Sequence, residues 1–378
     1  MNLLKVMTVV GTRPEIIRLS RVLPALDRAA KHVMVHTGQN FDYELNEIFF
    51  KDLDLRRPDY LLNVAASSPA RAIGNVIAAT DEVMDKERPD ALLVLGDTNS
   101  CLAAIAAKKR RIPIFHMEAG NRCFDDRVPE EANRRIVDHI SDINLTYSDI
   151  AREYLLREGR PPDRVIKTGS PMFEVLEYFR PRFAASTALE RFRVTPGEFF
   201  LISAHREENV DDPSRLAALA RAINEIAARY GKRVIVSTHP RTRLRVNAAG
   251  LVFDPLVELM KPLGYLDYVA LQERAACVLS DSGTISEESS ILNFPALNLR
   301  EAHERPEGME EASVVMTGLR AERILQGLEL VMSQPRGGDR MFRRVADYSM
   351  PNVSAKVVRI IHSYVDYVRR TAYGETLS

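Results

Sequence analysis

The sequence predicts an α/β protein built from two Rossmann-like domains, each containing a parallel sheet. Apolar runs of about four to six residues alternate with helical stretches along the chain, which is the pattern of repeated strand–helix–strand units. At 378 residues the chain is too long for one ordinary core and suits two such domains. Polar residues directly follow several apolar runs, and ligands bind where parallel strands end in this way.

The first domain is expected to span residues 1–173. Its strands are predicted at 3–10, 32–37, 91–95, 112–115, 143–147 and 165–168, with helices at 70–86, 100–109, 131–139 and 150–158. A further helix should begin near Pro14, because proline suits the first turn of a helix. Pro24 then predicts a kink or an early end of that helix.

The second domain is expected to span residues 174–350, with a linker and a short helix at 180–197. Its strands are predicted at 199–203, 234–237, 251–253, 277–279, 296–299 and 314–316, with helices between them. Residues 349–370 have apolar positions at helical spacing and predict a long amphipathic helix that closes the chain.

Composition excludes several functional classes. Lys+Arg and Asp+Glu both number 52, so the chain lacks the basic surface that a nucleic-acid partner requires. The three cysteines form no CxxC pair, which favours a reducing cytoplasm and argues against structural zinc. The first residues predict a strand rather than a signal peptide, and no apolar stretch approaches the ~20 residues of a membrane span.

Three carboxylates follow neighbouring elements of the first domain. Asp97 follows the run at 91–95, Glu118 follows the run at 112–115, and Glu130 lies at the start of the next helix. We expect them to gather at one crevice at the carboxyl edge of the sheet. A single strand-end aspartate is commonly a helix cap, but three carboxylates with arginines nearby indicate acid–base chemistry. Crowded carboxylates can provide an acid and a base at neutral pH.

Two further segments of this domain suit a polar ligand. Arg13 lies where a glycine turn enters a helix, and such a helix end binds anions through its free N–H groups. The loop at 38–44 combines polar and aromatic residues. It could face a sugar, or it could be a helix cap with a packed aromatic ring.

The second domain has two strand-to-helix turns with anion-binding chemistry. One carries His205 and Arg206, and the other carries Ser282, Gly283 and Thr284. Backbone N–H groups and hydroxyls at such turns can hold a phosphate, and Glu288, one helical turn further, could accept hydrogen bonds from a ribose. The alternative for Ser282 is an ordinary N-cap followed by acids that the helix dipole favours.

Several familiar motifs are missing from the sequence. There is no GxGxxG after a strand, so no bound NAD is expected, and there is no GxxxxGK[ST], HExxH or GxSxG. HREE is not a metal motif, because its histidine has no partner at helical spacing. We therefore expect neither cofactor nor metal.

The two domains carry different kinds of predicted site. The second has anion-binding turns, and the first has a group of carboxylates at the edge of its sheet. Together they indicate a nucleotide-sugar enzyme, with the diphosphate bound by the second domain and the sugar facing the first.

Six motifs in order carry a resemblance to a known family. They are GTRPEII, LGDTNS, HMEAGNR, PEEANRR, SAHREEN and SDSGTISEES. Together they resemble the non-hydrolysing UDP-N-acetylglucosamine 2-epimerases, essentially end to end. The resemblance implies a GT-B-like fold with the active site in the interdomain cleft, residues 351–378 crossing back to the first domain, and a homodimer without a membrane partner.

The resemblance also implies a mechanism. A proton at sugar C2 is not acidic, so the family eliminates UDP to give a glucal-type intermediate and adds UDP back with C2 inverted. By motif position, the acid and base candidates are Asp97, Glu118 and Glu130, and the sequence does not assign which removes the proton. Arg13, His205 and the Ser282–Gly283 turn would stabilise the departing UDP, and Arg134 would orient carboxylates or phosphate. His205 is thereby counted with the three carboxylates as catalytic, and Arg18 and Arg206 are further candidates for binding the UDP-sugar.

The chain departs from the common members of this family. It has Arg18 where they usually carry Lys, Thr284 where they carry Gly, and GQNFDYE where they have GQH followed by Arg. These segments look more like a capsule and O-antigen branch that converts UDP-2-acetamido-2,6-dideoxy-L-talose into UDP-N-acetyl-L-fucosamine. The 6-methyl group of such a sugar could contact Phe41, Tyr43 or Phe124.

Three alternatives stay open at this point. The first is the UDP-N-acetylglucosamine 2-epimerase reaction itself, which forms UDP-N-acetylmannosamine. The second is a nucleotide-sugar binding module that has lost catalysis, although all three candidate carboxylates are present. The third is a GT-B glycosyltransferase, which would need an acceptor groove.

Overall fold

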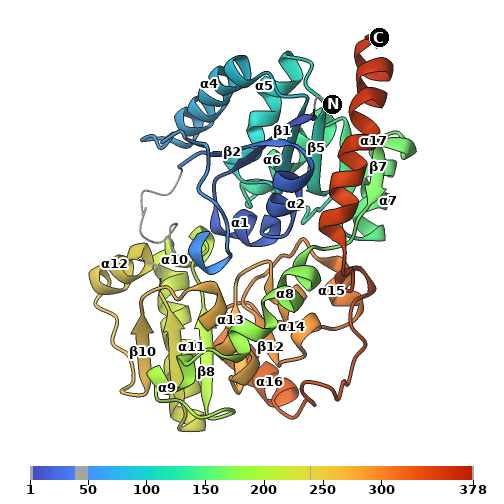
Figure 1. Cartoon of the computed structure of the whole chain (residues 1–378). Coiled ribbons are helices and arrows are strands. Elements are labelled where there is room, and N and C mark those ends of the chain that lie inside the picture. The colour runs from blue at the N-terminus through green and yellow to red at the C-terminus, as the bar shows by residue number, and fades with distance from the viewer. Residues whose placement is uncertain (1–2, 39–49, 239, 377–378) are drawn as a thin grey trace. The chain divides into compact units, whose positions relative to one another are not determined.

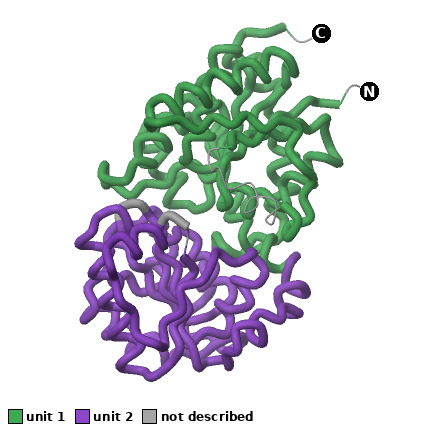
Figure 2. Tube along the Cα trace, turned by 90° about the vertical axis from the view of Figure 1, so that its left-hand side faces the viewer, with its two compact units in different colours: residues 1–177, 347–378 green, residues 178–346 purple. Residues whose placement is uncertain are grey.

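The computed structural model of the chain describes residues 3–38, 50–238 and 240–376, which form two compact units (Figures 1 and 2). The first unit comprises Met1–Glu177 and Asp347–Ser378, and the second comprises Tyr178–Ala346. Both units are α/β, and every strand pairing given for their sheets is parallel. The predicted fold class of two parallel-sheet α/β domains is confirmed.

The first unit contains a seven-stranded sheet in the order β3-β2-β1-β4-β5-β6-β7. Its strands are β1 Lys5–Val10, β2 Lys31–His36, β3 Tyr60–Leu61, β4 Ala91–Leu95, β5 Ile114–Ala119, β6 Ile143–Thr146 and β7 Val165–Lys167. The chain proceeds outward from β1 to β3 and then returns to place β4 beside β1. The strand order therefore reverses between β1 and β4, and ligands bind at such switch points in open α/β sheets.

Helices cover both faces of this sheet. They are α1 Arg13–Leu19, α2 Val22–Ala29, α4 Pro69–Glu87, α5 Ala103–Lys109, α6 Glu130–Ile140, α7 Asp149–Arg157 and α17 Val353–Tyr373, while α8 Met172–Ala184 runs across the boundary of the units. Side chains of α4 and α5 pack on one face, against apolar residues of β1, β2 and β4. On the opposite face, His32 of β2 bonds to Asp27 of α2, and α2 contacts α17.

The last helix, α17, packs against the first unit through one apolar stripe. Val357, Ile361 and Val365 recur at intervals of four residues and are buried. Arg369 adds an ion pair of 2.8 Å from Nη2 to Oδ1 of Asp90, within the same unit. The helix begins at Val353 rather than at the predicted residue 349, and Pro351 lies just before its start.

The second unit contains a six-stranded sheet in the order β10-β9-β8-β11-β12-β13. Its strands are β8 Phe199–Ser203, β9 Arg233–Ser237, β10 Val257–Met260, β11 Cys277–Ser280, β12 Ala296–Asn298 and β13 Val315–Met316. Its helices are α9 Ala188–Arg191, α10 Glu207–Val210, α11 Pro213–Tyr230, α12 Pro240–Ala248, α13 Tyr265–Arg274, α14 Ile285–Leu292, α15 Pro306–Glu310 and α16 Ala321–Val331. Here the strand order reverses between β8 and β11.

Some local predictions were wrong. The run at 251–253 is not a strand, because its residues lie in a loop whose Val252 is 81% exposed, and β10 forms at Val257–Met260 instead. The predicted linker from residue 180 lies partly in α8, which continues through Pro181. By contrast, the predicted early end of the first helix is confirmed, because α1 ends at Leu19, before Pro24. Pro24 occupies the first turn of α2, where its missing N–H has no cost.

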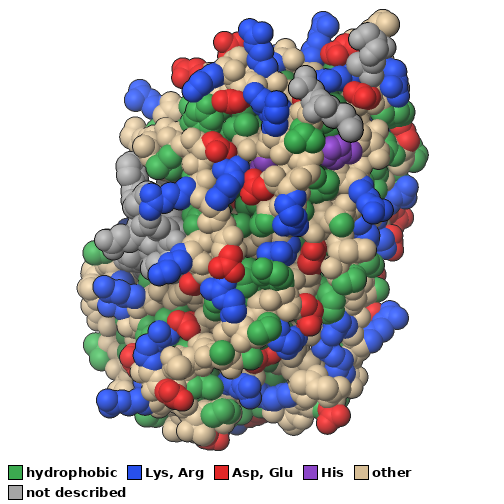
Figure 3. Space-filling model, viewed as in Figure 1, with side chains coloured by type: hydrophobic (Ala, Val, Ile, Leu, Met, Phe, Trp, Pro, Cys, Tyr) green, Lys and Arg blue, Asp and Glu red, His purple; other side chains and the backbone are tan. Residues whose placement is uncertain are grey.

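The surface suits a chain with no net charge. On the face drawn in Figure 3, Lys and Arg side chains are interspersed with Asp and Glu side chains. Among the described residues, no helix is both long enough and apolar enough to cross a membrane.

Candidate functional site

Asp97 and Glu118 leave the first sheet on neighbouring strands. Leu95, the last residue of β4, pairs with Met117 of β5, and the Gly96 N–H donates to the Met117 carbonyl at 3.0 Å. A Cβ on Gly96 would lie 3.9 Å from Oε2 of Glu118, so this carboxylate lies directly beside the turn that carries Asp97. The two carboxylates share the carboxyl edge of the sheet, next to the switch point between β1 and β4.

Glu118 is delivered by an irregularity within β5. The predicted strand end at residue 115 was wrong, because β5 continues to Ala119 and its register with β6 shifts between Met117 and Ala119. Glu118 has a φ of +66°, in the left-handed region that non-glycine residues seldom adopt. Bulges of this kind redirect a side chain, and strained backbone is concentrated at functional sites.

Glu118 forms an ion pair with Arg18. Nη1 of Arg18, in the last turn of α1, lies 3.2 Å from Oε2 of Glu118, and both side chains are 8% exposed. The Asn121 amide also lies near this carboxylate, with Nδ2 3.4 Å from Oε1. The guanidinium therefore places a positive charge beside a buried carboxylate.

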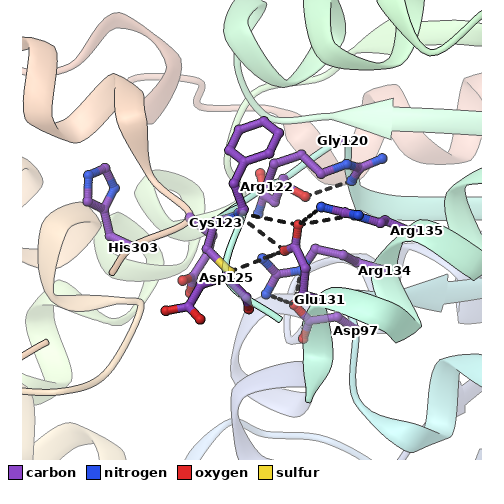
Figure 4. A network of polar contacts seen from close by, with 12 residues as sticks. Asp97, Gly120, Arg122, Cys123, Asp125, Glu131, Arg134, Arg135 and His303 are labelled. Atoms are coloured by element: carbon purple, nitrogen blue, oxygen red, sulfur yellow. Dashed lines mark hydrogen bonds and ion pairs between the residues drawn. The ribbon is translucent and has the colours of Figure 1, made fainter. Parts of the chain in front are cut away.

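Asp97 is paired with Arg134 of α6. Nε and Nη2 of Arg134 donate to Oδ2 of Asp97 at 3.0 and 2.7 Å, while Nη1 donates to Oε2 of Glu131 at 3.0 Å. Figure 4 shows Arg134 between these two carboxylates. Arg134 is almost fully buried, so its orientation is set, whereas Asp97 keeps 21% of its side chain exposed. Arg134 therefore contacts a carboxylate, and its role in the site stays a prediction.

Glu131 is a member of this network that sequence reasoning missed. Its carboxylate accepts hydrogen bonds from Arg134 and Arg135 and from the Cys123 backbone N–H, while Glu130 is the half-buried first residue of α6. Two adjacent glutamates at a helix start are equivalent by sequence pattern, and only the packing of α6 distinguishes them. The participation of Glu130 in the site stays a prediction.

The protonation of Glu131 gives a test of this network. Burial opposes ionisation, but hydrogen bonds from Cys123 and the charge of Arg134 outweigh it and lower the pKa of Glu131 below its ordinary 4.5. Such a carboxyl stabilises the fold above its unfolded pKa and loses that contribution as pH falls through the folded pKa. We expect Glu131→Gln to be less stable than the unaltered protein at pH 7, with the gap shrinking below about pH 4.5.

Urea unfolding between pH 7 and pH 3 measures this gap. Glu153→Gln is the control, because Glu153 is a glutamate of α7 with 55% of its side chain exposed. A gap that stays constant over this pH range would contradict the assigned ionisation of Glu131.

A second buried network supports the turns that carry Asp97 and Glu118. The His116 imidazole contacts the Gly96 carbonyl through Nε2 at 2.7 Å and Oδ1 of Asp138 through Nδ1 at 2.9 Å. Asp138 also accepts the Gly120 N–H at 3.2 Å and Nη1 of Arg122 at 2.6 Å. A Cβ on Gly120 would meet the Ala151 carbonyl oxygen at 2.3 Å, so only glycine fits at this point, where φ is +81°.

The glycine turn after β1 is joined to the turn after β4 by Glu15. Its buried carboxylate accepts the Thr12 N–H at 3.1 Å and the Ser100 hydroxyl at 2.6 Å, and it also bonds to Thr98. Burial raises the pKa of Glu15 in spite of these hydrogen bonds. Arg13 is the first residue of α1, as predicted, and is half-buried.

In the second unit, Asp281 joins the two predicted anion-binding turns. It is fully buried after β11 and accepts the backbone N–H groups of His205 and Arg206 and the side-chain amide of Asn209, each at 3.0 Å. The His205 imidazole is 42% exposed, with Nδ1 3.7 Å from Asp281. Sequence reasoning did not single out Asp281, although an acid directly after a buried strand was the available signal.

The Ser282–Gly283–Thr284 turn leads directly into α14. The Ser282 and Thr284 hydroxyl oxygens are 3.0 Å apart, and the Ser282 hydroxyl also accepts the Thr284 N–H at 3.3 Å. Glu288 is buried in the first turn of α14, where its Oε2 accepts the Gln272 side-chain amide at 2.7 Å. The turn can present hydroxyls and N–H groups to an anion, and Glu288 is fixed in position by Gln272.

The geometry provides carboxylates for acid–base work and an anion-binding turn. Within the described ranges, no three His, Cys, Asp or Glu side chains are grouped so that they could hold a metal ion. The predicted loop residues Phe41 and Tyr43 lie outside the described residues. Phe124 lies in the loop before α6 with 66% of its surface exposed.

Comparisons with known proteins agree with this architecture. A family model described as UDP-N-acetylglucosamine 2-epimerase matches residues 24–362. A Methanococcus maripaludis protein described as UDP-N-acetylglucosamine 2-epimerase is 36% identical over 340 residues, covering 88% of this chain and 93% of the relative. A Pseudomonas aeruginosa UDP-2,3-diacetamido-2,3-dideoxy-D-glucuronate 2-epimerase is 34% identical over 357 residues, covering 91% and 99%.

Solved structures give the same result. The UDP-N-acetylglucosamine 2-epimerase of Rickettsia bellii is 48% identical, with a TM-score of 0.91 and coverage of 99% of this chain and 100% of that chain. The Methanocaldococcus jannaschii UDP-GlcNAc 2-epimerase, solved in complex with UDP-GlcNAc and UDP, is 32% identical, with a TM-score of 0.89 and coverage of 95% and 100%.

Proposed function

The chain belongs to the non-hydrolysing UDP-N-acetylglucosamine 2-epimerase family, and from this premise we propose that it inverts C2 of a UDP-N-acetylhexosamine by eliminating and re-adding UDP. The observation that carries this proposal is the pair of strand-end carboxylates, Asp97 and Glu118, each held by its own arginine. The family is that of UDP-sugar 2-epimerases.

The proposed reaction balances without a redox step. A base removes the proton from C2, the C1–oxygen bond to the diphosphate breaks with its electron pair, and a C1=C2 double bond forms. A proton is then delivered to the opposite face of C2, and the diphosphate oxygen bonds to C1 again. Such a reaction needs a base, an acid and stabilisation of the charge on departing UDP.

We assign the acid and base roles to Asp97, Glu118 and Glu130 in the first unit. Arg18 and Arg134 orient Glu118 and Asp97, so either of these two carboxylates is a candidate to accept the C2 proton. Which carboxylate is the base stays open.

We assign UDP binding to Arg13 and to residues of the second unit. The exposed His205, the half-buried Arg206 and the Ser282–Gly283–Thr284 turn would hold the diphosphate, and Glu288 would accept hydrogen bonds from the ribose. Hydrogen bonds that strengthen as charge develops on the leaving diphosphate lower the barrier to elimination.

For the substrate, we propose UDP-2,6-dideoxy-2-acetamido sugars of the L series, with UDP-N-acetyl-L-fucosamine formed from its L-talo epimer for capsule or O-antigen synthesis. The support is the resemblance of the segments containing HTGQNFDYELNE, HMEAGNRCFDDRVPEEANRR and SAHREENVD to that branch. Exposed Phe124, next to the Cys123–Glu131 contact, is an apolar candidate for the 6-methyl group. A cytoplasmic location and a homodimer are part of the same proposal.

A second candidate substrate is UDP-N-acetylglucosamine. It is favoured by the description of the Rickettsia bellii relative, which shares 48% of its residues with this chain. The Pseudomonas aeruginosa relative is described as acting on a different acetamido sugar, so membership of the family leaves the sugar to be decided by experiment.

Proton NMR in D₂O decides between these substrates. We expect UDP-N-acetyl-L-fucosamine to exchange its C2 proton for deuterium and to yield the L-talo epimer, because reprotonation takes its proton from solvent. Exchange with UDP-N-acetylglucosamine alone would support the epimerase reaction but contradict UDP-N-acetyl-L-fucosamine as the substrate. UDP release that requires an added acceptor would favour a glycosyltransferase, and tight UDP binding without exchange in either compound would favour a binding module.

A further inference from the structure

The Ser282–Gly283–Thr284 turn packs against a buried carboxylate that sequence analysis did not assign. A Cβ on Gly283 would lie only 2.6 Å from Oε1 of Glu304, whose side chain is 7% exposed. A larger residue at this position would therefore force the Glu304 carboxylate to move. A carboxylate in this place would repel a diphosphate unless positive groups surround it.

Two arginines surround Glu304. Nη1 of Arg300 donates to Oε2 of Glu304 at 2.6 Å, and Nη2 of Arg206 lies 3.6 Å from Oε1 of the same carboxylate. These three side chains together carry one net positive charge beside the turn. The next arginine along the chain, Arg305, forms its ion pairs with Glu287 and Glu307 instead.

Arg300 has donor capacity beyond its contact with Glu304. Only 3% of its side chain is exposed, and its Nη2 has no hydrogen-bond partner among the described residues. A buried guanidinium N–H without a partner is unfavourable, and such groups in native proteins usually serve a ligand, an ion or water. Glu304 therefore links the turn to Arg300, because its Oε1 lies against Gly283 and its Oε2 accepts a hydrogen bond from Arg300.

We propose that Arg300 is a further diphosphate-binding residue, whose Nη2 donates to a phosphate oxygen held by the Ser282–Gly283–Thr284 turn. Glu304 is its positioning residue, because it orients the guanidinium through Nη1 and leaves Nη2 for the ligand. This inference rests on the proposed UDP-sugar function, and it explains why a carboxylate is placed beside an anion-binding turn.

The test separates a ligand role of Arg300 from a purely structural one. Glu304→Gln removes the buried carboxylate, so adding Arg300→Gln to it removes the guanidinium without leaving an unpaired buried charge. If Arg300 binds the diphosphate, calorimetric titration should show about 10–100-fold weaker UDP binding for the double variant than for Glu304→Gln alone. Uridine, which lacks phosphate, should bind both variants equally.

A matched control and a second variant complete the test. Arg340→Gln removes another partly buried arginine, one that bonds to the Ser290 and Ile291 carbonyls at the opposite end of α14, and it should leave UDP affinity unchanged. Arg300→Lys keeps the charge but offers a single ammonium, so it should bind UDP about tenfold more weakly and remain folded.

The possible failures are distinguishable. Equal UDP affinity of Glu304→Gln and the double variant, or an equal loss for uridine, would overturn the role of Arg300 and leave the proposed function in place. Absence of UDP binding by the unaltered protein would overturn the proposed function together with this inference.

Discussion

Asp97→Asn should reduce epimerisation and C2 deuterium exchange by about 10²–10⁴-fold, the usual contribution of an acid–base group. Asparagine keeps the size of the side chain and its hydrogen bonds from Arg134, but it is neither a base nor an acid near neutral pH. UDP affinity should stay within a few-fold of the unaltered value, because we assign UDP binding largely to the second unit. Deuterium exchange by NMR and UDP titration measure the two properties separately.

Asp81→Asn is the matched control for this variant. Asp81 also receives two hydrogen bonds from one arginine, with Nε and Nη2 of Arg110 at 2.5 and 2.9 Å, but its side chain is 43% exposed on α4. It should keep full activity. If Asp97→Asn also kept full exchange activity, Asp97 would be a structural partner of Arg134 and the assigned chemistry would be wrong.

Arg122→Met should produce the largest loss of stability. Arg122 is fully buried between Asp138, at 2.6 Å from Nη1, and Glu158, at 2.6 Å from Nη2. Methionine replaces the volume of the side chain but leaves the carboxylate of Asp138 buried without its guanidinium. Removing one partner of a buried ion pair costs about 3–5 kcal/mol, which corresponds to roughly 6–20 °C in Tm for a unit of this size.

Calorimetric melting tests this expectation and its cause. Adding Asp138→Asn removes the buried negative charge that Arg122→Met leaves without its guanidinium, and it keeps an acceptor for the Gly120 N–H. The double variant should therefore recover part of the lost Tm. Arg157→Met is the control, because Arg157 pairs with Glu153 on the surface with 71% of its side chain exposed. A loss no greater than that of Arg157→Met would show that the buried pair contributes little.

Much of the fold could be predicted because it is encoded locally. Apolar runs such as Ala91–Leu95 and Phe199–Ser203 are strands at the predicted residues, since a strand buried on both faces needs a continuous apolar sequence. Proline and glycine positions constrained the start of α1, and the apolar stripe of α17 was visible at helical spacing. Where the local signal was short, as at residues 251–253, the prediction was wrong, because tertiary pairing placed the strand at Val257–Met260.

The order of elements and the chemistry-bearing residue types were thus set by the sequence itself, including Asp97, Glu118, Glu130 and the Ser282–Gly283–Thr284 turn. Only tertiary structure decided which partners these residues receive. The packing of α6 buries Glu131 and leaves Glu130 half-buried, and the irregularity in β5 carries Glu118. Tertiary packing also pairs Glu118 with Arg18 and Asp97 with Arg134, and it places Glu304 against Gly283. The physical reason is that burial and ion pairing depend on groups that meet only when strands and helices distant along the chain pack together.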